Sequence, residues 1–347
     1  MAQEVSTVIL GEPELEGWAR LVAASPDGSI YAMPQYLEIL CRAAGGRYRV
    51  LGARLGEELA GGVALYERDS RRGPYVTPRP LLYYNGVVMR RFGSKYPSEQ
   101  TARNLKVFGA LATALATTDA RVELRCASSF PDARPFQAAG WRATPGYSYV
   151  VPIDDLAQAR ARIEQNLRRL VKRAEEEGVT VSDDDDFGAF YRLHAALMGR
   201  RDVGAYLPEA AFGAYFGELR QAELCRLYQA RLPDGRVAAS QLVLLGPGAV
   251  AHTAAAASDP EFQRTGAASL LRLKVFGALA ALGYAALDLT DAALNPVTHF
   301  KSQLGGDLRL HLVLAAPLRW KDRLGAGLAR LARGALARGR RVGGRAP

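Results

Sequence analysis

Ser258-Asp259-Pro260-Glu261-Phe262-Gln263-Arg264-Thr265-Gly266-Ala267-Ala268 opens the stretch that decides the fold, which runs on to Gly306. The quoted segment has the composition of a loop that brings a glycine to the start of a helix. An apolar run over residues 270–282 predicts this helix, and Gly283 ends it. A short strand over residues 285–289 and a second helix follow, with Gly305 and Gly306 at its end. This order of elements predicts a phosphate-binding half of an α/β fold.

A second copy of this unit lies earlier in the chain. The octapeptide Leu-Lys-Val-Phe-Gly-Ala-Leu-Ala occupies residues 105–112 and again residues 273–280. The segments after each copy also correspond, residues 121–124 with 286–289 and residues 136–141 with 300–306. Corresponding segments on both sides of the octapeptide favour duplication of a domain-sized unit over a chance match.

Each unit is expected to contain an opening helix, a hairpin and a helix–strand–helix segment. In the first unit residues 34–44 are expected to be helical, with strands at 48–55 and 62–67. In the second unit Pro233-Asp234-Gly235 is the expected turn between strands 224–232 and 236–245. The predicted class is α/β with mixed sheets. The predicted domains are residues 1–151 and 152–317, followed by a tail over 318–347, and Asp155 is expected to cap a helix over 156–177.

Composition narrows the classes of protein that the chain can belong to. Its 347 residues are 49% apolar, which is enough for two folded cores. Three cysteines without a Cys-x-x-Cys pair fit a reducing compartment and argue against a disulfide framework. The N-terminus lacks the pattern of a signal peptide, and no apolar run is long enough to span a bilayer. A cytoplasmic protein is expected.

The net charge of +10 is concentrated in the tail. Residues 318–347 contain nine basic residues and one acid, a net charge of +8, which leaves +2 for residues 1–317. Trp320, Leu324, Leu328 and Leu331 recur at helical spacing in this tail. The tail is therefore either an amphipathic helix on an anionic membrane surface or, because of its glycines, a frayed end.

The segment from Gln263 to Ala268 has the clearest chemical signal. Small residues allow backbone N–H groups to converge at a helix N-terminus, where the peptide dipoles favour a phosphate. The alternative is an ordinary helix start that binds nothing. The candidate donor-binding residues are Gln263, Arg264, Thr265, Gly266, Ala267 and Ala268.

In this context the segment resembles the coenzyme A loop of the GNAT acyltransferases, Gln/Arg-x-x-Gly-x-Gly/Ala. The order of motifs in the two units, together with His299-Phe300-Lys301 before Gly305-Gly306, is similar to the Fem-type (FemAB-like) aminoacyl and acyl transferases. Residues 33–37, 166–173 and 288–291 support this resemblance, which covers residues 30–316. The resemblance implies two tandem GNAT-like domains and transfer of an acyl or aminoacyl group to envelope precursors such as those of peptidoglycan.

The resemblance also implies the catalytic residues. Lys301 occupies the helical position at which a simple GNAT enzyme usually has a tyrosine that protonates the leaving thiolate. Phe300 and Lys301 would support transfer, with the lysine stabilising negative charge on the acyl carbonyl. Asp288, near the end of the late strand, is a candidate proton acceptor or a strand-end cap. A solvated surface lysine is the alternative for Lys301.

Other residues are candidates for the acceptor side. Arg200 and Arg201 follow a helix and suit a diphosphate or a carboxylate, although cations are also common at helix C-termini. Tyr206, Tyr84 and Asn85 could line an acceptor cleft, with simple packing as the alternative.

The first unit's counterpart of the donor loop, residues 98–103, has no glycine and carries Glu99, so one donor site per chain is expected. The four histidines show no ligand spacing, and no metal is proposed. The run Asp183 to Asp186 does not follow a calcium loop and is expected to be a solvated turn.

These observations predict a cytoplasmic N-acyltransferase, peripheral at the inner face of the membrane if the tail binds lipid. Its donor would be an acyl-CoA or an aminoacyl-tRNA, and its acceptor an amine on a lipid- or nucleotide-linked envelope precursor. Two alternatives stay open: an acetyl-CoA-dependent N-acetyltransferase of a soluble amine, and a non-enzymatic module that binds membrane or nucleic acid.

Overall fold

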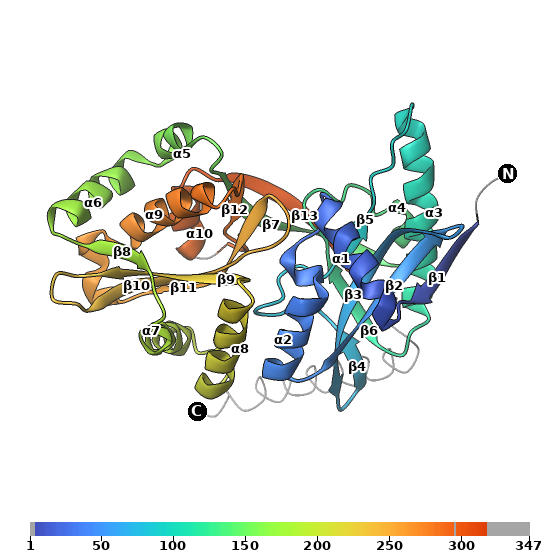
Figure 1. Cartoon of the computed structure of the whole chain (residues 1–347), viewed down its shortest axis with the longest axis horizontal. Coiled ribbons are helices and arrows are strands. Elements are labelled where there is room, and N and C mark those ends of the chain that lie inside the picture. Colours follow the sequence, from blue (N-terminus) through green and yellow to red (C-terminus); the bar gives the residue numbers. More distant parts are fainter. Residues whose placement is uncertain (1–3, 295, 318–347) are drawn as a thin grey trace, which may run out of the picture.

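The computed structural model describes residues 4–294 and 296–317. Its first part, on the right in Figure 1, contains the elements up to α4. They are β1 (Val5–Ile9), η1 (Glu12–Glu14), α1 (Leu15–Ala24), η2 (Ile30–Ala32), α2 (Pro34–Ala44), β2 (Arg47–Leu55), β3 (Glu58–Ser70), β4 (Gly73–Val76), β5 (Val87–Met89), α3 (Pro97–Ala116), β6 (Arg121–Arg125) and α4 (Arg134–Ala138).

The remaining elements form the second part and the connection between the two. They are β7 (Arg142–Pro152), α5 (Leu156–Arg162), α6 (Gln165–Glu176), β8 (Thr180–Asp183), α7 (Phe187–Arg200), α8 (Glu209–Gln221), β9 (Cys225–Arg231), β10 (Val237–Leu244), β11 (Val250–Ser258), η3 (Pro260–Thr265), α9 (Ala267–Ala281), β12 (Ala286–Asp288), α10 (Pro296–Ser302) and β13 (Asp307–Ala315). In Figure 1, α6 and α9 lie on one side of the second unit's strands, and α7 and α8 lie on the other.

All described strands belong to one mixed sheet, which confirms the predicted class. Its order is β1-β2-β3-β4-β6-β13-β7-β12-β11-β10-β9-β8, with β5 paired to β3. The pairs β4–β6 and β11–β12 are parallel, and the other strand pairs are antiparallel.

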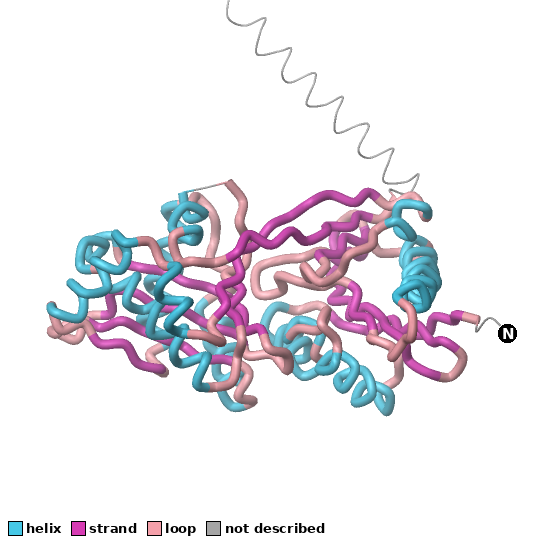
Figure 2. Tube along the Cα trace, turned by 90° about the horizontal axis from the view of Figure 1, so that it is seen from above, coloured by secondary structure: helices cyan, strands magenta, loops and turns pink. Residues whose placement is uncertain are grey.

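The last strand of each unit pairs with the other unit. Strand β7, from the first half of the chain, pairs with β12, whereas β13, from the second half, pairs with β6. The two strands also pair with each other from Asp307–Val150 to Ala315–Arg142, and Figure 2 shows them running together between the halves. The predicted boundary near Pro152 therefore divides the chain but not the sheet.

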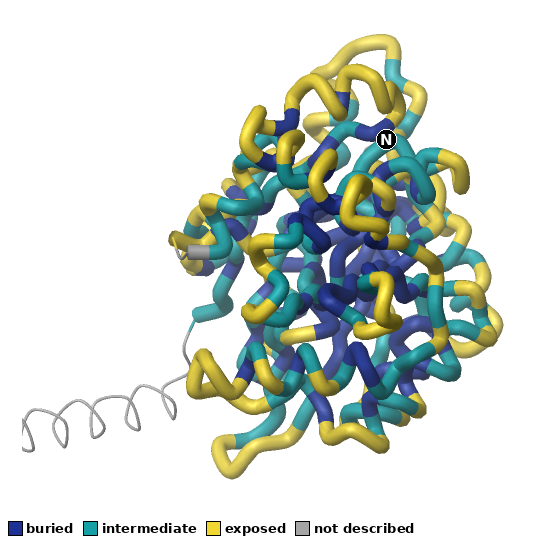
Figure 3. The backbone as a smooth tube through the Cα atoms, turned by 90° about the vertical axis from the view of Figure 1, so that its left-hand side faces the viewer, coloured by how far each residue is buried: buried dark blue, intermediate teal, exposed yellow. Residues whose placement is uncertain are grey.

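The buried interior, dark blue in Figure 3, comprises three apolar clusters. One packs α3 against the first unit's strands, and another packs α6 and α9 against the second unit's strands. The third is shared, because it joins Trp18 and Tyr36 of the first unit to Phe212 and Tyr215 of the second. The hydroxyls of Tyr36 and Tyr215 are hydrogen-bonded at 2.8 Å across this junction. The units thus share both a sheet and a core.

The local expectations are largely confirmed. Helix α2 has the predicted bounds, and Asp155 caps α5 by accepting hydrogen bonds from the amides of Ala157 and Gln158. The helix expected over residues 156–177 is two helices. Ile163 between them is buried and has extended backbone, and the amide of Glu164 bonds to the carbonyl of Gln303 instead of continuing a helix.

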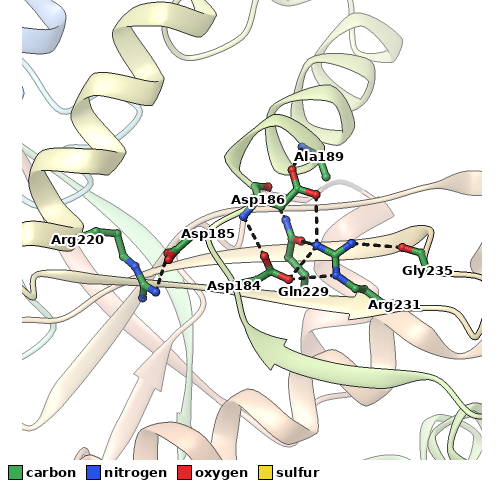
Figure 4. A network of polar contacts seen from close by, with 8 residues as sticks. All are labelled: Asp184, Asp185, Asp186, Ala189, Arg220, Gln229, Arg231 and Gly235. Carbon is green, nitrogen blue, oxygen red and sulfur yellow. Dashed lines mark hydrogen bonds and ion pairs between the residues drawn. The ribbon is translucent and has the colours of Figure 1, made fainter.

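The acidic run before α7 is an ion-pair network rather than the expected solvated turn (Figure 4). The guanidinium of Arg231 contacts the carboxylates of Asp184 and Asp186, at 2.8 and 3.2 Å. Arg220 pairs in the same way with Asp183 and Asp185. Asp186 also caps α7 by accepting from the Ala189 amide. These carboxylates anchor α7, whose other end reaches the candidate site.

Candidate active site

A cavity of about 150 Å³ lies where two parallel strands part. Strands β11 and β12 pair only from Val250–Ala286 to His252–Asp288. After this point β11 continues to Ser258, whereas β12 ends. Helices α7, α9 and α10 contribute side chains to the gap. Open α/β sheets commonly bind ligands at the carboxyl ends of such strands.

Four of the predicted site residues line this one cavity. They are Arg201, Tyr206, Phe300 and Lys301. The first two come from the end of α7 and the segment after it, and the last two come from α10. The cavity therefore joins the residues expected for the acceptor to those expected for catalysis.

The ammonium group of Lys301 is held by the backbone. It donates hydrogen bonds to the carbonyl oxygens of Thr290 and Asp291, the latter at 2.6 Å. Burial lowers the pKa of Lys301 to about 8, although the nearby carboxylate of Asp291 opposes this effect. A lysine has three N–H donors, so one remains for an acceptor in the cavity. This geometry is that of a positioned cation rather than of a solvated surface lysine.

The backbone that holds Lys301 is locally strained. Thr290 and Asp291 have φ angles of 48° and 47°, in the left-handed region that residues other than glycine rarely adopt. The amide of Thr290 donates to Oδ1 of Asp288 at 2.7 Å, and its hydroxyl donates to the carbonyl of Thr253 at 3.0 Å. These bonds fix the turn so that two successive carbonyls face one ammonium group.

Asp288 lies behind this turn and not in the cavity wall. Its side chain is buried, and Oδ2 accepts hydrogen bonds from the hydroxyls of Tyr84 at 2.7 Å and Ser148 at 3.4 Å. Nδ1 of His252 lies 3.9 Å from the same oxygen. Because its oxygens already bind protein donors, the geometry favours a positioning role over direct proton transfer. Proton acceptance by Asp288 stays a prediction.

The predicted donor loop is partly covered by α6. Gln263 and Arg264 are exposed, Thr265 and Ala268 are half-buried, and Gly266 and Ala267 are buried. Gly266 has φ 77°, and a Cβ atom at this position would lie 2.2 Å from the carbonyl oxygen of Leu170 in α6. Glycine is therefore required for a left-handed cap and for the close approach of α6.

The same loop has a positive environment at the start of α9. Nη1 of Arg173 in α6 donates to the carbonyl of Arg264 at 3.4 Å, which places a guanidinium beside the loop. A helix N-terminus with a glycine cap and an adjacent arginine fits a diphosphate. In the first unit the residues that correspond to this loop, 98–103, lie inside α3, which begins at Pro97, and so do not form a loop before the helix.

Three of the residues expected for the acceptor lie away from the cavity wall. Arg200 is exposed at the end of α7. Tyr84 is buried against Asp288, and the amide of Asn85 bonds to the backbone of Glu123 and Arg125 in β6. Tyr84 and Asn85 precede β5 instead of ending a strand. Tyr84 thus joins the two units, whereas Asn85 braces the sheet within the first unit.

Sequence reasoning missed three cavity residues, Arg272, His194 and Asp291. Arg272 lies in an apolar helix, where a lone arginine is normally taken as solvent-facing. His194 is buried, and burial lowers its pKa to about 4, so it is neutral and accepts a hydrogen bond from the Tyr206 amide. No sequence pattern singled out Arg272, which lies one position before the second copy of the octapeptide.

Within residues 4–294 and 296–317, no group of three or more His, Cys, Asp or Glu side chains is arranged to hold a metal ion. In the same ranges, no helix combines the length and the apolarity needed to cross a bilayer. The tail over residues 318–347 lies outside the described structure.

Residues 157–302 match the acetyltransferase (GNAT) domain family. The structure is similar to that of FemX, with a TM-score of 0.65 and 14% identity over 88% of this chain and 96% of that one. It also resembles L-PGS from Bacillus licheniformis, with a TM-score of 0.57 and 13% identity over 92% and 96% of the two chains. A tandem GNAT protein from the clavulanic acid biosynthesis pathway has a TM-score of 0.54 and 15% identity over 91% and 100%.

Residues 157–302 form a GNAT acetyltransferase domain, and the chain as a whole has the fold of tandem GNAT proteins. The domain match covers the second unit, and the structural similarities extend over both units. A search among curated protein sequences found no similar sequence. The prediction of an N-acyltransferase with two GNAT-like units is thus confirmed at the level of domain family and fold. The cavity lies in the matched unit, between its diverging strands.

Proposed function

We propose that the protein transfers an acyl group from an acyl-CoA to the amine of a cell-envelope precursor, in the cavity between β11 and β12. The observation that carries this proposal is the position of Lys301. Its ammonium is fixed by two carbonyls beside the gap and keeps one donor for an acyl oxygen. A preorganised donor of this kind stabilises the charge that develops on a carbonyl under attack.

The transfer itself balances without another reactant. The amine nitrogen attacks the thioester carbonyl carbon, a C–N bond forms and the C–S bond breaks. The amine proton leaves with the thiolate, so that an amide and a free thiol are the products. Lys301 would stabilise the carbonyl oxygen during this step, and Phe300 would pack beside the acyl group.

The donor's phosphates would lie at the start of α9. Gln263, Arg264, Thr265, Gly266, Ala267 and Ala268 form this loop, and Arg173 adds a positive charge to it. Arg272 follows Gly266 by six residues on the same helix, a rise of about 9 Å. The helix would thus connect the phosphate end of the donor to the cavity in which its acyl end reacts.

An aminoacyl-tRNA is the second candidate donor. Its support is a row of exposed basic side chains on α6, beside the donor loop: Arg168, Arg169, Lys172 and Arg173. Such a row suits a polynucleotide backbone. An envelope acceptor is supported by the sequence resemblance to the Fem-type transferases. It is also supported by the similarity to the C-terminal domain of a putative lysylphosphatidylglycerol synthetase from Agrobacterium fabrum, with a TM-score of 0.57 and 14% identity over 94% and 98% of the two chains. Arg200, Arg201 and Tyr206 would contact this acceptor, and membrane contact through residues 318–347 remains a prediction.

Thiol release from acetyl-CoA, followed with a chromogenic disulfide, tests the proposal. Amine acceptors would include an envelope precursor peptide and soluble amines. Amine-dependent release that falls in Lys301→Met, but not in Lys274→Met, is the expected result. Lys274 is the control because it lies on the surface of α9 and pairs with Glu175 at 3.1 Å. A folded protein that uses neither a CoA thioester nor a charged tRNA would contradict the proposal.

A further inference from the structure

The cavity that contains Lys301 has an unusual charge for a site that would accept a neutral acetyl group. Three cationic side chains line it, Arg201, Arg272 and Lys301, against the single carboxylate of Asp291. His194 adds no charge at neutral pH, because burial lowers its pKa to about 4. The wall is therefore net positive.

Arg272 is the most informative of these cations. Its Nη1 atom is buried and has no hydrogen-bond partner in the described part of the chain. Burial lowers the pKa of its guanidinium to about 10, so the group still carries its charge at pH 7. Buried charges in proteins are normally paired. An arginine that is retained unpaired in a cavity wall indicates a partner that arrives with a ligand.

The neighbouring carboxylate does not supply that partner. Asp291 is exposed, and its Oδ1 accepts a hydrogen bond from the Ala293 amide at 3.1 Å. Its backbone carbonyl is bound to Lys301. No ion pair joins Arg272 to an acidic residue among residues 4–294 and 296–317.

We propose that this cavity binds a substrate carboxylate, with Arg272 as its principal partner and Arg201 beside it. The proposal rests on the acyl transfer argued above and specifies its substrate class. Guanidinium groups recognise carboxylates through paired, charge-assisted hydrogen bonds. The cavity volume of about 150 Å³ suits a short chain.

The bound carboxylate can belong to either of the two substrates. It belongs either to the acyl group, as in a dicarboxylic monothioester, or to an acceptor such as an amino acid. In both cases Arg272 would set the specificity and Lys301 the reactivity. The two sources are separated by varying the donor and the acceptor independently.

Calorimetric titration of the full-length protein with succinyl-CoA and acetyl-CoA tests the donor arm. We expect the wild-type protein to bind succinyl-CoA about tenfold more tightly than acetyl-CoA. In Arg272→Met the two dissociation constants should differ by no more than about twofold. Acetyl-CoA affinity should not change, and Arg272→Lys should retain part of the preference. Lys274→Met, two residues further along α9, is the matched control.

The acceptor arm uses acetyl-CoA with alanine or alaninamide. A preference of about tenfold for alanine, lost in Arg272→Met, would assign the carboxylate to the acceptor. Equal use of both donors and of both acceptors by the wild-type protein would overturn the proposal, as would a preference that survives in Arg272→Met.

A donor-independent measurement separates this proposal from the proposed function. Succinate alone should raise the melting temperature of the wild-type protein but not of Arg272→Met, with succinamide as the neutral control. If no thioester binds while succinate still stabilises the protein through Arg272, the carboxylate site stands and the CoA donor is wrong. If succinate has no selective effect and no thioester binds, both ideas fail.

Discussion

At the scale of single residues, Lys301 is the position on which the proposed chemistry depends. Removing one preorganised donor from an oxyanion site lowers kcat by about 10²–10³. Lys301→Met is therefore expected to reduce kcat by this amount with little change in stability. Steady-state thiol release against Lys274→Met would measure the effect, and a Lys301→Met enzyme with wild-type kcat would exclude the role.

The same lysine predicts a pH dependence. The protonated form is the one that stabilises an oxyanion, and its pKa is lowered to about 8 by burial. The rate should hold up to about pH 7 and fall as pH rises through 8, since Lys301 then loses its proton. A pH profile of kcat/KM at constant ionic strength would show this decrease above pH 8. A rate that keeps rising to pH 10 would contradict the assignment.

Tyr84 of the first unit is connected to the turn that binds Lys301 through Asp288. Its hydroxyl donates to buried Asp288 at 2.7 Å, and Asp288 fixes the Thr290 amide in the turn that binds Lys301. Tyr84→Phe should cost about 1–3 kcal/mol of unfolding free energy and shift the pH at which the rate decreases. Tyr48→Phe is the control, because its hydroxyl also donates to a carboxylate, that of Glu38 at 2.9 Å, but between β2 and α2 of the first unit. Identical pH profiles in wild type and Tyr84→Phe would rule out the coupling.

At the scale of elements, the start of α9 depends on Gly266. Alanine at this position would combine an unfavourable φ of 77° with a clash against the Leu170 carbonyl. Gly266→Ala should destabilise the protein by at least about 2 kcal/mol, measured by urea unfolding. Gly277→Ala on the same helix has open space and should be neutral or stabilising by up to about 1 kcal/mol. Equal free energies of unfolding for the two variants would show that α6 can move away from position 266, and that glycine is not required there.

Elements with strong local signals were predictable, and those set by distant contacts were not. Helix α2 and the cap Asp155 follow from local chemistry, and the repeat located α3 and α9. The exchange of β7 and β13 was not predicted, because each pairs with residues about half the chain away and no local pattern encodes that choice.

The candidate site was predictable to a similar extent. Phe300, Lys301, Arg201 and Tyr206 could be named from motifs and do meet in one cavity. Arg272 could not, because its significance depends on what surrounds its guanidinium. The left-handed turn at Thr290 and Asp291 was equally unpredictable, since β-branched threonine rarely adopts this conformation and aspartate adopts it at only a minority of its positions.

At the scale of the whole molecule, the strand exchange predicts that neither unit folds alone. Residues 152–317 without β7 would expose the edges of β12 and β13, and residues 4–151 would lack β13, the antiparallel partner of β6. The shared core with its Tyr36–Tyr215 contact would also be opened. Separately expressed fragments should aggregate, while the intact chain unfolds in one transition. A monomeric, cooperatively folded fragment would show that the units are independent domains.

The central claim is that one donor site, in the second unit, serves the whole chain. Calorimetric titration of the full-length protein with acetyl-CoA and succinyl-CoA tests it most directly. The account predicts saturable binding of one thioester per chain, weakened by Arg173→Met beside the donor loop and unaffected by Arg103→Met at the corresponding part of α3. Absence of binding by folded protein, or a stoichiometry of two per chain, would contradict it.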